Sequence, residues 1–429
     1  MTWTDTDAIL AEMDDRREEW LETLQGFVRT PSENPPGDTR DVAAYFRDVL
    51  DGYGIDHETI APREEMPNVV GHFEGGAGDP DDGPHLTFNG HLDTYPVGEL
   101  DRWERDPFSG TIEEGRIHGR GVSDMHGGFV ATLAAFVYLF EHREEFAGRV
   151  SIAGVSDEET GGEWGTEYLV REHPEYSGDA VLNGEPSSGM IRFAERGPVW
   201  VDLRVRGESA HSAYPHGLNA IEVLSDVLHE MRNDPDFEAL ADVPPDVREA
   251  IEGGRSEVEE LFGEGSTDFV LSPSLNVGTI EGGEKVNLTA EKARAEVDLR
   301  LPIGSATDDA LAWVEDLVTG FPGEVSVECI SRTEPTYTDP GHPLVRTLRS
   351  CAARVQGRES NPPPYACGFG FTDCRFYRRE GVPAAYYGPY PYNMGSQNEY
   401  ITVEDFAESV AVHTLTAVEY VTDNPSDGS

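Results

Sequence analysis

The chain has 429 residues, of which 82 are acidic and 32 basic, so its formal net charge is −50. A negative charge of this size repels nucleic acid and anionic membranes, and we expect neither as a partner. The plainest interpretation of the acidic composition is adaptation to high salt, where counterions screen the self-repulsion.

The length favours two domains, because single cores stop growing at about 250–300 residues. No apolar run approaches the roughly 20 residues that span a bilayer, and the acidic N-terminus lacks the pattern of a secretory signal. The four cysteines form no CxxC pair, so we expect reduced, buried thiols and a cytoplasmic protein. They are Cys329, Cys351, Cys367 and Cys374.

The first 196 residues predict one part of an α/β catalytic domain, with a central mixed sheet flanked by helices. Apolar residues at helical spacing indicate the helices, and short apolar runs bounded by turns indicate the strands. The expected helices are Asp5–Arg29, Thr39–Tyr53 and Gly128–Glu141. The expected strands are Pro67–Phe73, His85–Asn89, Arg149–Ser156 and Ala180–Asn183.

A different pattern begins near Gly197 and predicts a small α+β domain over residues 197–331, with four strands and two helices. Its expected strands are Val199–Val205, Ser274–Ile280, Ala293–Leu301 and Glu324–Ile330, and its helices are Asn219–Met231 and Asp308–Thr319. The acidic stretch Asp234–Asp268 is expected to form an extra helical excursion. Residues 332–429 predict the return of the catalytic domain, with helices at Pro343–Val355, Thr372–Arg379 and Val403–Tyr420.

Four polar stretches follow predicted strands, where open α/β sheets build their sites. They are Asn89-Gly90-His91-Leu92-Asp93-Thr94, Gly119-Arg120-Gly121-Val122-Ser123-Asp124-Met125-His126-Gly127-Gly128, Ser156-Asp157-Glu158-Glu159-Thr160-Gly161-Gly162 and Asn183-Gly184-Glu185-Pro186. Each stretch alone would also fit a purely structural role, such as a turn, a helix cap or a solvated acidic loop. Their joint order is hard to produce by acidic composition and favours a metal site.

The first and third stretches suggest how such a site would work. His91 and Asp93 are two residues apart and point the same way on an extended chain. A metal-binding histidine usually donates its other ring nitrogen to a carboxylate, which Asp93 could supply. In the third stretch, one carboxylate can bind metal while its neighbour serves as a base.

These motifs resemble those of the M20-type zinc aminoacylase and carboxypeptidase superfamily, which includes succinyl-diaminopimelate desuccinylase, acetylornithine deacetylase and aminoacylase. The resemblance runs from Pro31-Ser32 to Asn398-Glu399. Its most specific stretches are Gly90–Thr94, Gly119–Met125 and Gly207–Pro215, the last followed by Gly217-x-Asn219-Ala220-Ile221.

The resemblance implies a site for two divalent metal ions, with zinc favoured and cobalt or manganese as alternatives. The implied metal ligands are His91, Asp124, Glu159 and Glu185. Asp93 would orient His91, and Asp124 would bridge both ions. Glu158 would be the general base that takes a proton from the metal-held water.

The inserted domain would be a lid and dimerisation domain, which predicts a homodimer. His211 would reach the active site, often from the partner subunit in the family, and stabilise the oxyanion. Arg300 would hold a substrate carboxylate, and Asn287 matches a lid asparagine, although the usual Ile-Pro does not follow it. Gly370 lies in Gly368–Asp373, which matches a substrate-side loop of the catalytic domain.

Two positions depart from the family pattern. His126 stands where the family has a lysine that is not a metal ligand. Gly395 stands where the last metal ligand, a histidine, is expected, and glycine has no side chain to bind a metal. Water, Asn398, Glu399 or His126 could substitute, or the second metal could be weak or absent.

The function predicted from these features is metal-dependent hydrolysis of the amide bond in an N-acyl amino acid, of the deacetylase or desuccinylase type. A small anionic substrate suits Arg300, because a guanidinium grips a carboxylate through two hydrogen bonds. A dipeptidase or carboxypeptidase is the alternative within the superfamily. A non-catalytic binding protein with a degraded metal site is the alternative from another class, and Gly395 is its only support.

Overall fold

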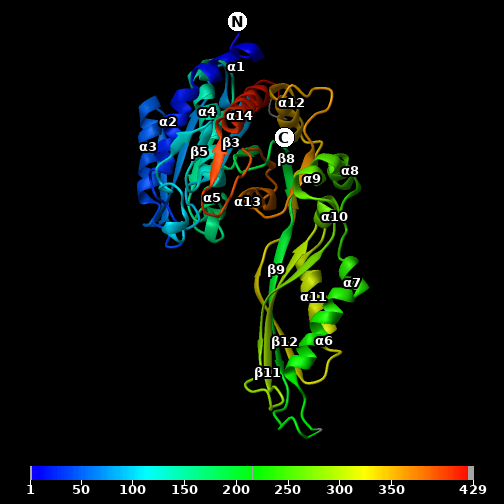
Figure 1. The fold of residues 1–429 in the computed structure, drawn as a ribbon. Helices are drawn as coiled ribbons and strands as arrows, with labels where there is room; N and C mark the ends of the chain where they lie inside the picture. Colours follow the sequence, from blue (N-terminus) through cyan, green and yellow to red (C-terminus); the bar gives the residue numbers. More distant parts are fainter. Residues whose placement is uncertain (1, 215, 424–429) are drawn as a thin grey trace. The chain divides into compact units, whose positions relative to one another are not determined.

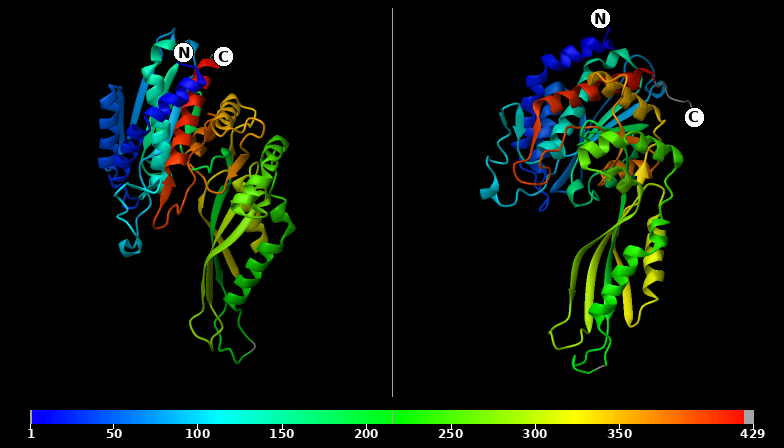
Figure 2. Two further views of the ribbon diagram at one scale, coloured as in Figure 1. Left: turned by 45° about the horizontal axis from the view of Figure 1, so that its top comes forward. Right: turned by 45° about the vertical axis from the view of Figure 1, so that its right-hand side comes forward.

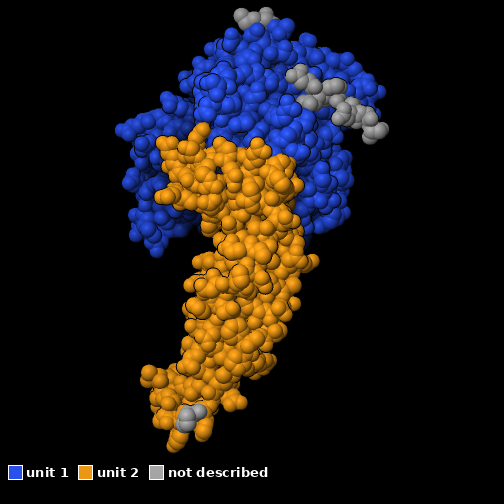
Figure 3. All heavy atoms as spheres, turned by 90° about the vertical axis from the view of Figure 1, so that its right-hand side faces the viewer, with its two compact units in different colours: residues 1–193, 338–366, 372–429 blue, residues 194–337, 367–371 orange. Residues whose placement is uncertain are grey.

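The computed structural model describes residues 2–214 and 216–423, which divide into two compact units (Figures 1 and 3). Unit 1 comprises residues 1–193, 338–366 and 372–429, and unit 2 comprises residues 194–337 and 367–371. The short segment 367–371, which contains Gly370, therefore belongs to unit 2. Each unit has its own core and is described by itself.

Unit 1 is an α/β layer around a mixed sheet with the strand order β1-β2-β6-β3-β7-β15-β8. The strands are β1 (His57–Arg63), β2 (Met66–Glu74), β3 (His85–His91), β6 (Arg149–Val155), β7 (Ala180–Asn183), β8 (Ile191–Glu195) and β15 (Ala384–Tyr386). The central strands β6, β3, β7 and β15 are parallel neighbours, so their carboxyl ends share one edge. A small second sheet pairs β4 (Thr111–Glu113), β5 (Arg116–His118) and β16 (Tyr400–Thr402). The predicted fold class is confirmed.

Helices cover both faces of this sheet. The helices are α1 (Thr6–Asp15), α2 (Arg17–Val28), α3 (Arg40–Tyr53), α4 (Gly127–Glu141), α5 (Thr166–Glu172), α12 (Pro343–Val355), α13 (Cys374–Arg379) and α14 (Val403–Asp423). On one face, Phe46 of α3 and Phe129 of α4 pack over Gly154 of β6. On the other face, residues of α5 and α13 form an apolar cluster with β7 and β15.

Helix α4 and the turn before it form the apolar centre of unit 1. Over Val122–Glu141 the mean hydropathy is 1.3, which by length and composition alone would suffice for a membrane span. The structure buries 94% of that window inside the protein, the placement of a core helix. The window is not an uninterrupted apolar run, because Ser123, Asp124 and His126 lie within it.

The helix predicted over Asp5–Arg29 is two helices, α1 and α2, which break at Arg16. The break lets the two helices pack on different partners. Met13 of α1 receives a hydrogen bond from Thr414 of α14, with 3.4 Å from Oγ1 to Sδ. Phe27 of α2 stacks edge-on against Phe129 of α4, with 5.6 Å between ring centroids. The single-helix prediction failed because apolar spacing continues across the break.

Unit 2 contains an antiparallel sheet with the order β10-β11-β9-β12, and α6 and α11 cover one face of it (Figure 2). Its strands are β9 (Gly197–Arg206), β10 (Ser274–Gly282), β11 (Lys292–Leu301) and β12 (Glu324–Arg332), and its long helices are α6 (Ala220–Asn233) and α11 (Thr307–Val318). Alternation places Val199, Val201, Leu203 and Val205 in the core. Two short strands, β13 (Thr336–Tyr337) and β14 (Tyr365–Gly368), complete the strand inventory of the described residues.

The acidic stretch after α6 is helical, as expected. It forms α7 (Pro235–Glu238), α8 (Pro245–Gly253), α9 (Arg255–Phe262) and α10 (Ser266–Leu271). One cysteine prediction was wrong. Cys351, Cys367 and Cys374 are buried, but Cys329 is exposed, because β12 is an edge strand with a solvent-facing side.

Candidate metal centre and substrate site

Two site residues follow neighbouring parallel strands of unit 1. His91 is the last residue of β3, and Glu185 comes two residues after β7. A buried amide pair holds the two strand ends together: Asn183 Nδ2 donates to Asn89 Oδ1 at 2.9 Å, and Asn183 Oδ1 accepts from the Glu185 amide at 2.7 Å. As a result, Glu185 Oε1 lies 3.6 Å from Nε2 of the fully buried His91.

Asp124 comes from the π-helical turn Val122–His126 that leads into α4. Its backbone is non-helical, with φ −128° and ψ 96°, and the N-cap position of α4 belongs to His126. The helix-cap explanation of Asp124 is therefore wrong. Asp124 Oδ1 instead lies 3.1 Å from His91 Nε2.

Glycines explain how α4 comes so close to the strand ends. A Cβ on Gly128 would lie 1.6 Å from the carbonyl oxygen of Gly184. Only glycine permits this backbone contact between the Asp124 motif and the Glu185 motif. In the sequence, Gly128 and Gly184 look like ordinary loop residues. In the structure they form a packing contact between the segments that carry Asp124 and Glu185.

The sequence suggested that the Asp93 carboxylate holds His91. In the structure the backbone oxygen of Asp93 does so instead. His91 Nδ1 lies 2.8 Å from the backbone oxygen of Asp93 and 3.6 Å from Oδ1. The carboxylate accepts hydrogen bonds from the amides of Glu158 and Glu159, each at 3.2 Å, and from Asn34 Nδ2 at 2.9 Å. Asp93 therefore orients His91 by its main chain and the Glu158-Glu159 turn by its side chain.

His91, Asp124 and Glu159 form a group whose ligand atoms all lie within 4.8 Å of one another. Glu159 Oε1 is buried and has no hydrogen-bond partner in the described part of the chain. Burial, followed by the charge of Asp124, raises the pKa of Glu159 to about 11, and the same two causes raise the pKa of Glu185 well above its ordinary value. A divalent cation would give Glu159 Oε1 a partner and offset the repulsion among the buried carboxylates. The residues therefore fit a metal site.

Glu158 lies beside this group but has a different partner. Its Oε1 is 3.4 Å from Nη1 of Arg375, whose Nη2 donates to the Gly161 carbonyl at 2.8 Å. Burial raises the pKa of Glu158 to about 8. A carboxyl group with a pKa near neutrality can both accept and return a proton, which is what a general base needs. Sequence reasoning missed Arg375, because nothing near α13 in the sequence points to Glu158.

Two of the residues considered as substitutes for the side chain missing at Gly395, Glu399 and Asn398, are engaged elsewhere. Glu399 pairs with Arg120 Nη1 at 2.5 Å and accepts from Ser123 N and Oγ at 2.9 and 2.8 Å. Asn398 Oδ1 accepts from the Glu104 amide at 2.8 Å. His126 is buried, and its Nε2 lies 3.0 Å from the Leu92 carbonyl, while its Nδ1 has no hydrogen-bond partner among the described residues. Glu399 thus supports the Asp124 turn rather than binding a metal.

Unit 2 holds the other predicted residues in two places. The Ser212 amide donates to the Asn287 carbonyl at 3.1 Å, and His211 forms a β-bridge with Leu288, so His211 and Asn287 lie on touching loops. These loops follow β9 and precede β11, at the sheet end where Lys292 pairs with Arg206. Arg300 is eight residues further along β11, roughly 26 Å away at about 3.3 Å per residue, where its Nε bonds Asp298 at 3.0 Å.

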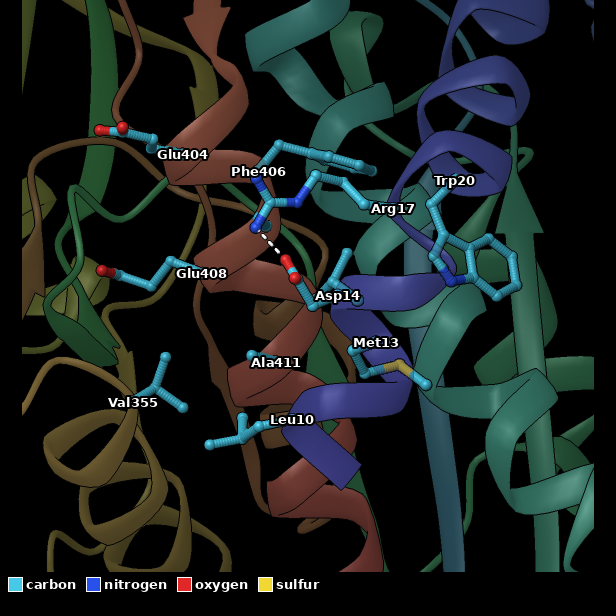
Figure 4. Close-up of a pocket in the computed structure, with 12 residues that line it drawn as sticks. Leu10, Met13, Asp14, Arg17, Trp20, Val355, Glu404, Phe406, Glu408 and Ala411 are labelled. Atoms are coloured by element: carbon cyan, nitrogen blue, oxygen red, sulfur yellow. Dashed lines mark hydrogen bonds and ion pairs between the residues drawn. The ribbon is translucent and has the colours of Figure 1, made fainter. Parts of the chain in front are cut away.

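Unit 1 also has a pocket of about 250 Å³ away from these residues (Figure 4). Leu10 and Met13 of α1, Val355 of α12 and Ala411 of α14 line it, and Arg17 and Asp14 form an ion pair at its rim. No predicted site residue lines this pocket. The chemistry described above therefore belongs to the strand ends and not to this cavity.

Comparisons with known proteins agree with the fold. Residues 87–419 match the model of peptidase family M20/M25/M40, so the chain belongs to this family and is a hydrolase that acts on amide bonds. It is 28% identical over 357 residues to a probable succinyl-diaminopimelate desuccinylase of Staphylococcus epidermidis, covering 80% of this chain and 82% of the relative.

Solved structures share the fold. The M20 family metallo-carboxypeptidase Sso-CP2 of Sulfolobus solfataricus has a TM-score of 0.76 at 21% identity, covering 94% of this chain and 99% of its own. The YXEP protein of Bacillus subtilis, described as a dinuclear metal-binding peptidase of the M20 family, has a TM-score of 0.65 at 12% identity, covering 97% and 99%.

Proposed function

We propose that this protein hydrolyses the amide bond of a small, anionic N-acyl amino acid, as a deacetylase or desuccinylase. The observation that carries the proposal is the position of Glu158, held by Arg375 and by the Asp93 carboxylate beside the convergent group of His91, Asp124 and Glu159. The desuccinylase relative supports the acyl amino acid class.

His91, Asp124, Glu159 and Glu185 would hold two divalent metal ions, with zinc at His91. Bound metal ions would lower the pKa of a coordinated water and polarise the amide carbonyl. Glu158 takes the proton of the attacking water and passes it to the leaving amine. Arg375 and the Asp93 carboxylate fix Glu158 from its side chain and its amide, so that the base is held in place before substrate arrives.

The spacing of residues within unit 2 supports the further proposal of a homodimer. A small substrate cannot touch groups at both ends of β11, roughly 26 Å apart. If Arg300 binds the substrate carboxylate and His211 stabilises the oxyanion, two copies of unit 2 must contribute to each site. Cross-linking or light scattering in molar salt would show a dimer, and a monomer with full activity would contradict this assignment.

The test of the proposed function is a substrate panel with the zinc-loaded protein in molar salt. N-succinyl and N-acetyl amino acids should be cleaved, a chelator should abolish cleavage, and zinc should restore it. Cleavage of dipeptides alone would replace the proposal with a peptidase. Substrate binding without cleavage by fully metallated protein would favour a binding protein.

A further inference from the structure

The break between α1 and α2 lies beside the pocket of unit 1, the cavity of about 250 Å³ drawn in Figure 4. Leu10 and Met13 of α1 and Arg17 and Trp20 of α2 follow one another at spacings of three, four and three residues, so all four line one side of it. Helix α14 lines the opposite side. The pocket is therefore enclosed by helices of one unit.

Two nitrogen donors on the α2 side have no acceptor. Trp20 is 0% exposed, yet its Nε1 makes no hydrogen bond within residues 2–214 and 216–423. Arg17 uses Nη2 for the ion pair with Asp14, while its buried Nε has no partner among the described residues. Figure 4 shows the indole nitrogen on the side of the ring toward the other labelled residues. Because a buried N–H without an acceptor costs free energy, this side of the pocket needs an acceptor.

The α14 side has the opposite deficit, since it carries carboxylates without a cation. Glu404 and Glu408 both line the pocket and are four residues apart on α14, where like charges repel. Glu408 Oε1 accepts from the Tyr387 hydroxyl at 2.5 Å and from Gln356 Nε2 at 3.1 Å, and both donors are neutral. Glu404 makes no ion pair in the part of the chain that the structure describes. A positive charge placed here would offset the repulsion.

The wall between these two sides is apolar. Met13, Phe406, Val410 and Ala411 are all at most 8% exposed and line the pocket together with Leu10. The volume is below the range of about 300–1,000 Å³ that holds drug-sized ligands. The pocket thus suits a ligand about as large as one amino acid, with an apolar body between an acceptor and a cation.

We propose that this pocket binds a free amino acid with an apolar side chain. The ligand carboxylate accepts from Trp20 Nε1 and Arg17 Nε, and the ammonium group lies against Glu404 and Glu408. An apolar amine would leave both donors without an acceptor. An apolar acid would bring a further negative charge among the carboxylates and no cation.

A free amino acid is also the product that the proposed hydrolysis releases. That link rests on the proposed function, whereas the ligand class rests on the pocket itself. His91, Asp124, Glu159 and Glu185 do not line the pocket, so the amino acid would occupy it without displacing a metal ligand.

The test is titration calorimetry of the metal-loaded full chain in molar salt with three matched probes. Leucine carries both charged groups, isopentylamine lacks the carboxylate, and isocaproate lacks the ammonium group. Leucine should bind about 10–100-fold more tightly than either, the usual worth of a hydrogen bond to a charged group.

Two variants with matched controls locate the binding. Ala411→Leu fills the pocket, and Ala11→Leu is its control, because Ala11 is exposed on α1 outside the lining. Glu404→Gln removes one charge from an exposed residue and leaves the core untouched, with the exposed Glu359→Gln as its control. Both pocket variants should weaken leucine binding by about 10-fold or more, and both controls should bind like wild type.

Three results would contradict the proposal. Equal leucine binding by wild type, Ala411→Leu and Glu404→Gln would show that leucine binds elsewhere and overturn the pocket. Isopentylamine or isocaproate binding as tightly as leucine would overturn the amino acid class. No leucine binding by wild type would overturn both. Because none of these titrations measures amide cleavage, the proposed hydrolase would still stand or fall by its own substrate panel.

Discussion

The two halves of the metal centre are built in different ways. The sheet-built half consists of His91 and Glu185, which follow the adjacent strands β3 and β7. The loop-built half consists of Glu159, which lies in the turn after β6, with Asp124 between the halves. Because strand register fixes the positions of His91 and Glu185, both ligands can be predicted from the sequence. Gly395, where the family pattern expects a ligand, lies in a loop and not at a strand end.

Glu158 serves both halves, and Glu158→Gln should have the largest effect. Gln has no basic oxygen for the proton, so we expect kcat to fall by about 10²–10⁴-fold, the usual contribution of a general base. Metal content should not change, because Glu158 is not a ligand in this account. Steady-state kinetics with elemental analysis would check both points. Activity within a few-fold of wild type would refute the base assignment.

Support for the Asp124 turn, between the halves, depends on the buried pair of Arg120 and Glu399. Glu399→Gln leaves the Arg120 charge buried without its partner and should lower the free energy of unfolding by about 3–5 kcal/mol. The exposed Glu359→Gln is the matched control and should stay within about 0.5 kcal/mol of wild type. Denaturant unfolding in molar salt measures both. Equal stability of the two variants would show that the pair does not support the turn.

Asp93 connects the halves, because its main chain orients His91 and its side chain holds the amides of Glu158 and Glu159. Asp93→Asn keeps the main-chain contact but turns one acceptor into a donor facing an amide. We expect metal affinity to fall by about 10–100-fold, with the loss greater for the second ion. Competition with a chromogenic chelator would measure it. A loss confined to the first ion would mean that the carboxylate acts on His91 after all.

A buried histidine of α14, His413, makes a pH-sensitive contact with the segment after β15. His413 Nε2 lies 2.7 Å from the Tyr387 carbonyl, and burial lowers the pKa of His413 to about 4. The folded form therefore binds fewer protons than the unfolded chain between pH of about 6.5 and 4. The contribution of neutral, buried His413 to the free energy of unfolding is complete above a pH of about 6.5 and is lost as the pH falls toward 4.

His413→Gln keeps a donor for Tyr387 and removes the titration. Its unfolding free energy should fall less than that of wild type between those pH values, by on the order of 1–3 kcal/mol. Parallel pH profiles of the two proteins would show that His413 is not the anchor.

The sequence predicted most of the elements and the ligand cluster, because both depend on local patterns. The helix over Thr39–Tyr53 and the strand over Arg149–Ser156 match α3 and β6 closely. The motifs with His91, Asp124 and Glu159 do converge. The roles of the unit 2 residues His211, Asn287, Arg300 and Gly370 stay predictions.

What the sequence did not give depends on contacts between distant segments. The break at Arg16 follows from different packing partners of α1 and α2. Arg375 meets Glu158 across 217 positions of chain. Tyr95 and Gly395 are 300 residues apart, and no local pattern pairs them. Short polar motifs can be read from a sequence, but contacts between distant segments require the fold.

The measurement that tests the central claim most directly is metal content per chain, by elemental analysis of protein purified in molar salt without chelator and then offered zinc and manganese. This account predicts two ions per chain. A chain that takes up neither metal would contradict it.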